Sequence, residues 1–163
     1  MLTFSELSEN DSTHVSLLQA LFEAAPDYSV TVEGRLPGPQ DGLEALRALP
    51  VGKARADKVV GIYRFEGTVV GCLDIVRAHP EPHIAFVGLL LFAADHQGHG
   101  FGAEALRHIK ELAQGWQCTR LRLAVIDTNT RALHFWKREG FYELYRKVTT
   151  KYTGAAIVME TAL

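Results

Sequence analysis

The sequence is short of several features that would place a protein in a specialised class. It has only two cysteines among 163 residues, and 17 basic side chains oppose 19 acidic ones, for a formal charge of −2 at pH 7. No stretch approaches the roughly 18 uncharged apolar residues of a membrane-spanning helix. The first residues, MLTFSELSEND, lack the basic region and apolar core of a secretory signal. We therefore expect a cytoplasmic protein without membrane or nucleic-acid partners.

Cysteine and metal chemistry are both poorly represented. Cys72 and Cys118 lie in apolar, strand-like runs, so we predict buried free thiols. Among the seven histidines, His79 and His83 occupy a proline-containing turn and have no third ligand nearby in the sequence. We therefore predict no metal site.

Hydrophobic periodicity predicts an α+β fold in one domain that spans residues 1–163. Strands are expected at 2–7, in two runs of 58–79 that turn at Glu66-Gly67, and at 84–94, 120–127, 141–148 and 155–163. Helices are expected at 12–25, around 43–49, from the glycine-rich stretch at 98 to 112, and at 129–140. Residues 26–42 contain three prolines and three glycines and are expected to be irregular, and residues 51–57 are expected to form a loop.

The glycine-rich stretch poses a question, because glycine destabilises a helix interior by roughly 1 kcal/mol relative to alanine. Gly98, Gly100 and Gly102 stand where a helix must begin. The first turn of a helix has backbone N–H groups without intrahelical partners, and the helix dipole makes that end positive. The stretch therefore predicts a phosphate or pyrophosphate site. It is neither a P-loop, which needs Gly-Lys-Ser/Thr, nor a dinucleotide fingerprint, which needs G-x-G-x-x-G.

Two motifs together resemble a known family. Gln97-Gly98-His99-Gly100-Phe101-Gly102 resembles the Q/R-x-x-G-x-G/A motif of the GNAT superfamily of N-acyltransferases. The segment NTRALHFWKREGF, 129–141, resembles the second motif of that superfamily. The resemblance implies an acyl-CoA donor, acetyl-CoA first. It also implies a mixed, mostly antiparallel central sheet, splayed between strands 84–93 and 119–126, with helices on both faces.

The resemblance assigns cofactor contacts residue by residue. The loop should hold the pyrophosphate through its backbone, and its residues are Gln97, Gly98, His99, Gly100, Phe101, Gly102 and Ala103. The end of the preceding strand should pair by its main chain with the pantetheine arm, at Leu90, Leu91 and Phe92. Asn129 stands where the family places a polar contact to the cofactor, and it is equally suited to cap a helix.

Trp136 departs from the family pattern, which has tyrosine at this position as the acid that protonates the departing thiolate. An indole N–H donates a hydrogen bond but does not release its proton. At pH 7 the thiolate of a thiol with pKa about 8.5 lies only about 2 kcal/mol above the protonated thiol, so the thiolate can leave without an acid. Trp136 could wall the acyl site or simply pack in the core. Tyr142 and Tyr63 are the alternative acids.

The reaction also needs a base, because a primary amine of pKa near 10.4 is almost fully protonated at pH 7. Asp74 is the candidate, since it is the one charge in the strand VVGCLDIV, although an ion-paired structural role would also explain it. The resemblance implies that the irregular N-terminal segment forms the edge, or lip, of the acceptor-binding site. Asp27, Tyr28 and Glu33 lie there, where an acidic lip would suit a cationic amine.

The leading hypothesis is an N-acetyltransferase that moves acetyl from acetyl-CoA to an amine of a small molecule or peptide by direct attack. A second is a CoA-binding sensor or regulatory module with weak catalysis, and a third is an acyltransferase with a non-amine acceptor. Family members often dimerise, so the resemblance allows a homodimer. The acceptor determinants should lie in 26–56 and 77–83, where the sequence carries no readable code.

Overall fold

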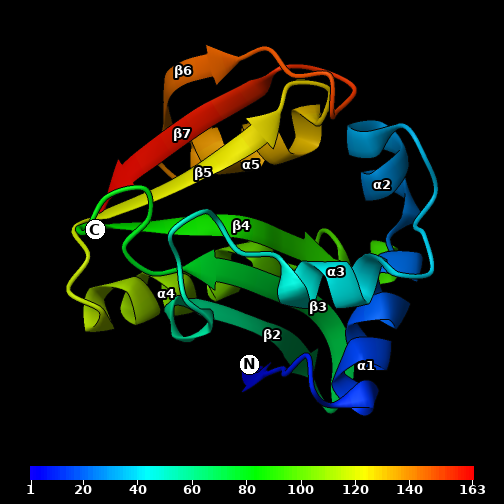
Figure 1. Cartoon of the computed structure of the whole chain (residues 1–163). Coiled ribbons are helices and arrows are strands. Elements are labelled where there is room, and N and C mark those ends of the chain that lie inside the picture. The colour runs from blue at the N-terminus through cyan, green and yellow to red at the C-terminus, as the bar shows by residue number, and fades with distance from the viewer.

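The computed structural model describes all residues, 1–163, and is built on one seven-stranded sheet (Figure 1). Its strands are β1 (Leu2–Glu6), β2 (Lys58–Phe65), β3 (Thr68–Val76), β4 (Ile84–Phe92), β5 (Arg120–Ile126), β6 (Tyr142–Lys147) and β7 (Ala156–Ala162). Its helices are α1 (Ser12–Glu23), α2 (Pro26–Glu33), α3 (Asp41–Arg47), α4 (Phe101–Gly115) and α5 (Thr130–Arg138), with short 3-10 turns η1 (Arg55–Asp57) and η2 (Ala94–His96). None of the helices combines the length and apolar character that crossing a membrane would require.

The sheet is splayed at its centre, as the resemblance implied. The strand order is β1-β2-β3-β4-β5-β7-β6, and every neighbouring pair is antiparallel except β4 and β5. These two parallel strands pair only at Ile84–Val87 and Arg120–Leu123. Beyond that point they diverge, and the gap widens toward α2 (Figure 1). The fold class is therefore confirmed.

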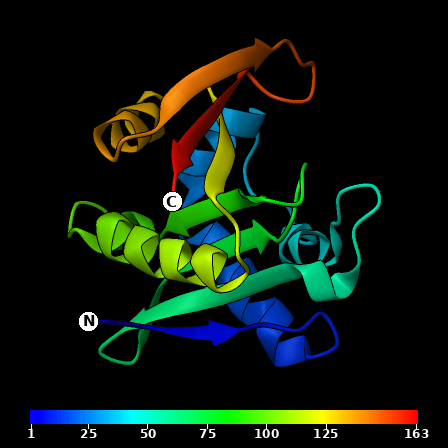
Figure 2. The same ribbon diagram turned by 90° about the vertical axis from the view of Figure 1, so that its left-hand side faces the viewer.

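Helices cover both faces of the sheet and define two apolar clusters. On one face α4 and α5 pack in a cluster of 19 buried residues that includes Ile109 and Trp136. On the other face α1 and α3 pack in a cluster of 10 that includes Leu21 and Leu46. In Figure 2, α4 crosses in front of the strands and α1 lies behind them. Cys72 and Cys118 are buried and free, as predicted.

Most local predictions hold because their signals are short-range. Asp11 caps α1 by accepting from the backbone N–H of Thr13 at 2.9 Å. The β2–β3 hairpin turns at Glu66 and Gly67, both with positive φ. Gly140, with φ 95°, follows the end of α5 in the position where helices favour glycine.

Residues 26–33 were expected to be irregular, and this prediction is wrong. They form α2, which begins at Pro26 and is followed by Gly34 with φ 74°. Proline at the first helical position is favoured because its missing N–H would be unpaired there anyway, and glycine after the last turn adopts the left-handed conformation freely. The same two residues that suggested a loop are thus the start and stop signals of a short helix. Its position over the splay makes it part of the site.

Candidate active site

A cavity of about 710 Å³ opens where β4 and β5 diverge. Its walls are the end of β4, the end of β5 with the loop that follows, the first turn of α4, one face of α5, and α2. The cavity therefore collects the two sequence motifs, which are separated by α4 and β5 along the chain. A volume of this order is typical of sites that bind a small molecule or cofactor.

The glycine-rich loop forms one end of this cavity, and two of its glycines are required by the backbone. Gly98 and Gly100 have φ of 78° and 79°, values that side chains rarely permit. Gly100 is the N-cap of α4, and no side chain caps the helix there. The first N–H groups of α4 are thus left bare at the cavity wall, as an anion site requires.

Gly102 has a different reason to be glycine. A Cβ at this position would lie 2.9 Å from the ring of Phe135 on α5. The small residue lets the start of α4 approach α5 closely, so the two motifs contact each other directly. The sequence alone assigned all three glycines to the anion site; Gly102 does line the cavity, and its lack of a side chain also has this packing reason.

Gln97 connects the two sides of the loop. Its Nε2 donates to the carbonyl oxygen of Phe92 at the end of β4 over 3.0 Å, and its Oε1 accepts from Arg131 on α5 over 2.7 Å. A side-chain bridge of this kind fixes the position of the loop relative to the end of β4 and to α5. Arg131 itself lines the cavity and was not anticipated from the sequence.

The end of β4 contributes a bulge and a free edge. Asp74 of β3 pairs with Leu89 and Ile75 pairs with Val87, which leaves Gly88 as the extra residue of a β-bulge. The three predicted pantetheine residues, Leu90, Leu91 and Phe92, line the cavity beyond it. Because β5 has diverged at this level, the main chain of this stretch has no strand partner on the cavity side.

Asp74 lies against the bulge but does not itself line the cavity. A Cβ at Gly88 would be 3.2 Å from the Asp74 carboxyl carbon, and Gly88 does line the cavity. The Asp74 carboxylate is 3.0 Å from the ammonium of Lys58. Burial raises the pKa of Asp74, and the Lys58 charge opposes that shift. Both roles considered for Asp74, an ion pair and a base beside the site, therefore have a structural basis.

Lys58 anchors that ion pair to α3. Its side chain is 3% exposed, and its ammonium donates to the carbonyl oxygens of Ala45, at 2.8 Å, and Ala48, at 2.5 Å. These carbonyls belong to the end of α3, where the helix dipole is negative and favours a cation. Lys58 thus ties α3 to the strand that carries Asp74.

Trp136 and Asn129 both line the cavity from the second motif. The indole of Trp136 is 7% exposed and packs edge-on against Phe135 and Phe141, with ring centroids 4.9 and 5.0 Å away. Asn129 caps α5 by accepting from the N–H of Ala132 over 3.3 Å. Each residue combines a packing or capping role with a place on the cavity wall.

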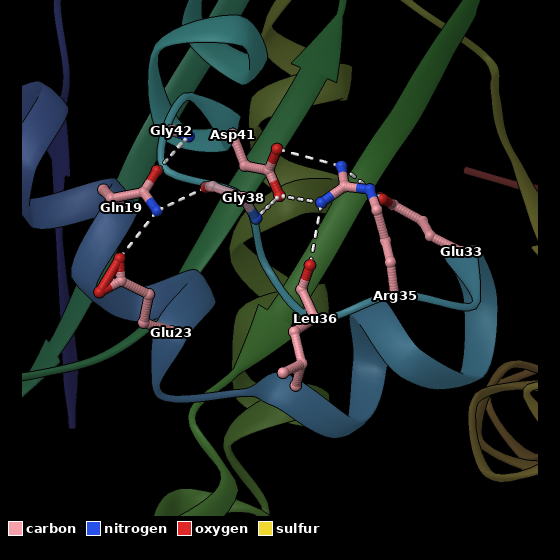
Figure 3. Close-up of polar contacts among 8 residues, drawn as sticks. All are labelled: Gln19, Glu23, Glu33, Arg35, Leu36, Gly38, Asp41 and Gly42. Carbon is pink, nitrogen blue, oxygen red and sulfur yellow. Dashed lines mark hydrogen bonds and ion pairs between the residues drawn. The ribbon is translucent and has the colours of Figure 1, made fainter.

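Besides Asp74, three predicted site residues lie outside the cavity. Tyr142 is on the outer strand β6, where its hydroxyl contacts Glu160 and Arg120, each at 3.3 Å. Glu33 forms an ion pair with Arg35 at 2.8 Å (Figure 3). His99 stacks on Phe101, with ring centroids 5.7 Å apart, and is absent from the cavity wall.

The two ends of the cavity differ in charge. Asp27 and Tyr28, the predicted acceptor residues, line the cavity from α2, and Asp27 is the only carboxylate in its wall. Burial raises the pKa of Tyr28, so its phenol stays protonated. On the other side, α5 presents cationic or ionisable side chains at positions 131, 134 and 138, which sequence reasoning missed. The i, i+3, i+7 spacing that places them on one face was the signal available.

Comparisons with known proteins agree with this geometry. Residues 17–141 match the model of the Acetyltransferase (GNAT) family. An acetyltransferase from Thermus thermophilus superposes with a TM-score of 0.79 at 25% identity, over 100% of this chain and 97% of that one. A GNAT acetyltransferase from Elizabethkingia anophelis with acetyl-CoA bound has the same fold, with a TM-score of 0.71 at 11% identity over 99% and 98% of the two chains.

The similarity to one curated relative covers only a short stretch of the chain. Thialysine N-epsilon-acetyltransferase from Bos taurus is 36% identical over 50 residues, which is 31% of this chain and 29% of that protein. The aligned part thus spans under a third of the relative. The chain belongs to the GNAT acetyltransferase family.

Proposed function

We propose that the protein transfers the acetyl group of acetyl-CoA to an amine by direct attack within the cavity between β4 and β5. The observation that carries this proposal is the bare first turn of α4, held open by two left-handed glycines, at the end of a splay with a free strand edge. An anionic head and an amide-rich arm in one ligand match these two features. The bovine relative, named for N-epsilon acetylation of thialysine, supports an amine as acceptor.

The cavity suits coenzyme A along its whole length. The diphosphate would contact the N–H groups from Gly98 to Ala103, near the guanidinium of Arg131. The amides of the pantetheine arm would pair with the main chain of Leu90–Phe92, which satisfies backbone groups that otherwise lack a strand partner. The wholly apolar side chains of this stretch are compatible with that role, because the contact is made by the backbone.

Our proposed chemistry balances as one addition and one elimination. The neutral amine nitrogen attacks the thioester carbonyl carbon, the C–S bond breaks, and coenzyme A leaves as a thiolate. The amine loses one proton to reach its neutral form and a second as the amide forms. We assign Asp74, which lies behind the Gly88 bulge, as the group that receives the first of these protons by way of a water, while the second passes to solvent water and from there to the thiolate. Trp136 walls the acyl site and offers only a hydrogen bond.

Replacing Trp136 with tyrosine is expected to change turnover by less than about 30-fold, because a thiolate leaving at pH 7 costs only about 2 kcal/mol relative to the thiol. The measurement is the rate of thiol release from acetyl-CoA with a saturating amine. A gain of several hundredfold in the variant would show that the missing acid limits the natural enzyme.

Replacing Asp27 with asparagine is expected to raise KM for a cationic amine about three- to fivefold, with little effect on kcat, since an exposed charge pair contributes at most about 1 kcal/mol. The effect should shrink at about 0.5 M salt, where exposed charges are screened. Glu44→Gln, an exposed acid of α3 outside the cavity, is the matched control. An equal change in that control would remove Asp27 from the acceptor site.

The proposal as a whole is tested by calorimetric titration with coenzyme A, followed by a thiol-release assay over an amine panel. We expect binding and turnover together. Binding without turnover on any amine would leave the sensor or regulatory module as the function. Absence of binding to the folded protein would overturn the cofactor assignment.

A further inference from the structure

We propose that the acceptor is a small free amine of about amino-acid size and that amines carried by longer peptides are excluded, an inference that rests on the proposed function. The structural reason is that α2 forms a fixed roof over the splay. It contributes Asp27, Tyr28, Thr31 and Val32 to the cavity wall. Both ends of this roof are hydrogen-bonded, each to a different half of the sheet.

The first attachment is at the junction of α1 and α2. The N–H of Ala94, just after β4, donates to the carbonyl oxygen of Ala24 over 3.0 Å. This bond joins the beginning of α2 to the half of the sheet that contains β4. The main-chain donor and acceptor fix the position of the junction whatever side chains α2 carries.

The second attachment, which we call the threonine latch, consists of Thr31, Val32, Thr128 and Thr153. The N–H of Thr153, in the β6–β7 loop, donates to the carbonyl oxygen of Val32 over 2.9 Å. The hydroxyls of Thr128 and Thr153 are 2.8 Å apart, and both are within hydrogen-bond distance of the carbonyl oxygen of Thr31. Each hydroxyl has one proton, so one donates to that carbonyl and the other donates to its neighbour.

Two glycines show that the latch is closely fitted. A Cβ at Gly154 would lie 2.0 Å from Oδ1 of Asp127, so a side chain there would displace the Asp127 carboxylate where the β6–β7 loop approaches the β5–α5 loop. A Cβ at Gly34, which follows α2, would lie 3.3 Å from Cγ2 of Thr153. The end of α2 and the two loops are therefore in van der Waals contact as well as hydrogen-bonded.

The segment after α2 is also held in place. Arg35 contacts Glu33 and Asp41, while the side-chain amide of Gln19 binds the carbonyl oxygen of Gly38 and the N–H of Gly42, each at 2.8 Å (Figure 3). This network joins the α2–α3 connection to α1. The roof is thus fixed where it begins, where it ends and along the chain that follows.

A roof that connects both halves of the splay restricts what can enter beneath it. A peptide acceptor brings about 3.3 Å of main chain per residue beyond its reactive amine, and on the side of the cavity formed by α2 that chain would meet the helix or the latch. The cavity has the volume of one small-molecule site, and the acyl arm of the donor takes part of it. Space for a small amine remains beside Asp27, the single carboxylate of the wall.

The test compares the same amine in two contexts. Wild-type protein is assayed for thiol release from acetyl-CoA with free lysine and with a heptapeptide that has lysine at its centre, and likewise with alanine amide and a heptapeptide that begins with alanine. In whichever pair reacts, we expect kcat/KM to be at least about 100-fold higher for the small amine than for the peptide. Equal values for the two contexts would overturn this inference and leave the proposed function standing.

The latch is then weakened by Thr153→Val, which keeps the shape of the side chain and the backbone bond to Val32 but deletes the Thr153 hydroxyl. We expect the preference for the small amine to fall at least about tenfold through a gain on the peptide. Thr150→Val, an exposed position of the same loop without a side-chain hydrogen bond, should keep the wild-type preference. A preference unchanged in folded Thr153→Val protein would overturn the hydroxyl contacts of the latch as its cause. Failure of wild-type protein to bind coenzyme A would instead overturn the proposed function, and this inference with it.

Discussion

Gly100→Glu is expected to abolish coenzyme A binding, with an affinity loss of at least about 100-fold. The new carboxylate would stand at the N-terminus of α4, where the diphosphate is proposed to lie, and opposed like charges cost several kcal/mol at an interface. A loss of about 2.8 kcal/mol corresponds to 100-fold. The measurement is calorimetric titration with coenzyme A, with circular dichroism to confirm the fold.

The matched control for this variant is Gly52→Glu. Gly52 has φ of 82°, close to the 79° of Gly100, and at neither position would a Cβ meet an atom within 4 Å. The two substitutions therefore impose the same backbone strain and the same charge, one at the cavity and one outside it. We expect wild-type affinity in the control, and equal affinities in the two variants would contradict the assignment of the glycine-rich loop.

Asp74→Asn is expected to lower turnover about 100-fold or more, the usual contribution of a positioned general base. The pH dependence follows from the direction of its pKa. Burial raises the pKa of Asp74, so the acid limb of kcat/KM should lie at a higher pH than for an ordinary carboxylate, and the variant should lose that limb. Because the folded-state pKa is the higher one, the contribution of Asp74 to stability is present at low pH and is lost as pH rises through that value.

A second substitution separates catalysis from structure at Asp74. The single variant leaves the buried Lys58 ammonium without its carboxylate, and breaking a buried pair costs roughly 3–5 kcal/mol of stability. Lys58→Met combined with Asp74→Asn removes both charges, so thermal unfolding should show stability recovered. Turnover should remain low in the double variant if Asp74 is the base. Recovery of turnover together with stability would mean that Asp74 acts only through its ion pair.

The parts of the fold that the sequence predicted are those encoded by short-range patterns. The alternation in β5, the apolar run of β4 and the glycines before α4 each determine local structure without reference to distant residues. α2 was missed because proline and glycine signal a turn and a helix boundary equally well, and only its packing over the splay distinguishes the two. The bulge at Gly88 depends on the register with β3, which no single strand specifies.

The site was predictable to the extent that it follows from motifs. The loop at 97–103 and the end of β4 do line one cavity, apart from His99. Tyr142 could not be placed, because its distance from the second motif in sequence is short while β6 lies at the outer edge of the sheet. Glu33 likewise could not be placed from the sequence, because its position depends on its ion pair with Arg35. Pairings of this kind are properties of the tertiary structure, and a charge in a loop has no pattern that reveals them.

The roof over the splay has a consequence for how acceptor preference could diverge. Its attachments are received by main-chain carbonyl oxygens of Ala24, Thr31 and Val32, so they survive exchange of almost any side chain in α2. Residues 27 and 28, which line the cavity where we propose that the acceptor binds, are free to vary while the helix keeps its place. The side chains of a short helix that is anchored by its backbone can therefore be exchanged one by one. Acceptor selectivity could change there without any rearrangement of the rest of the cavity.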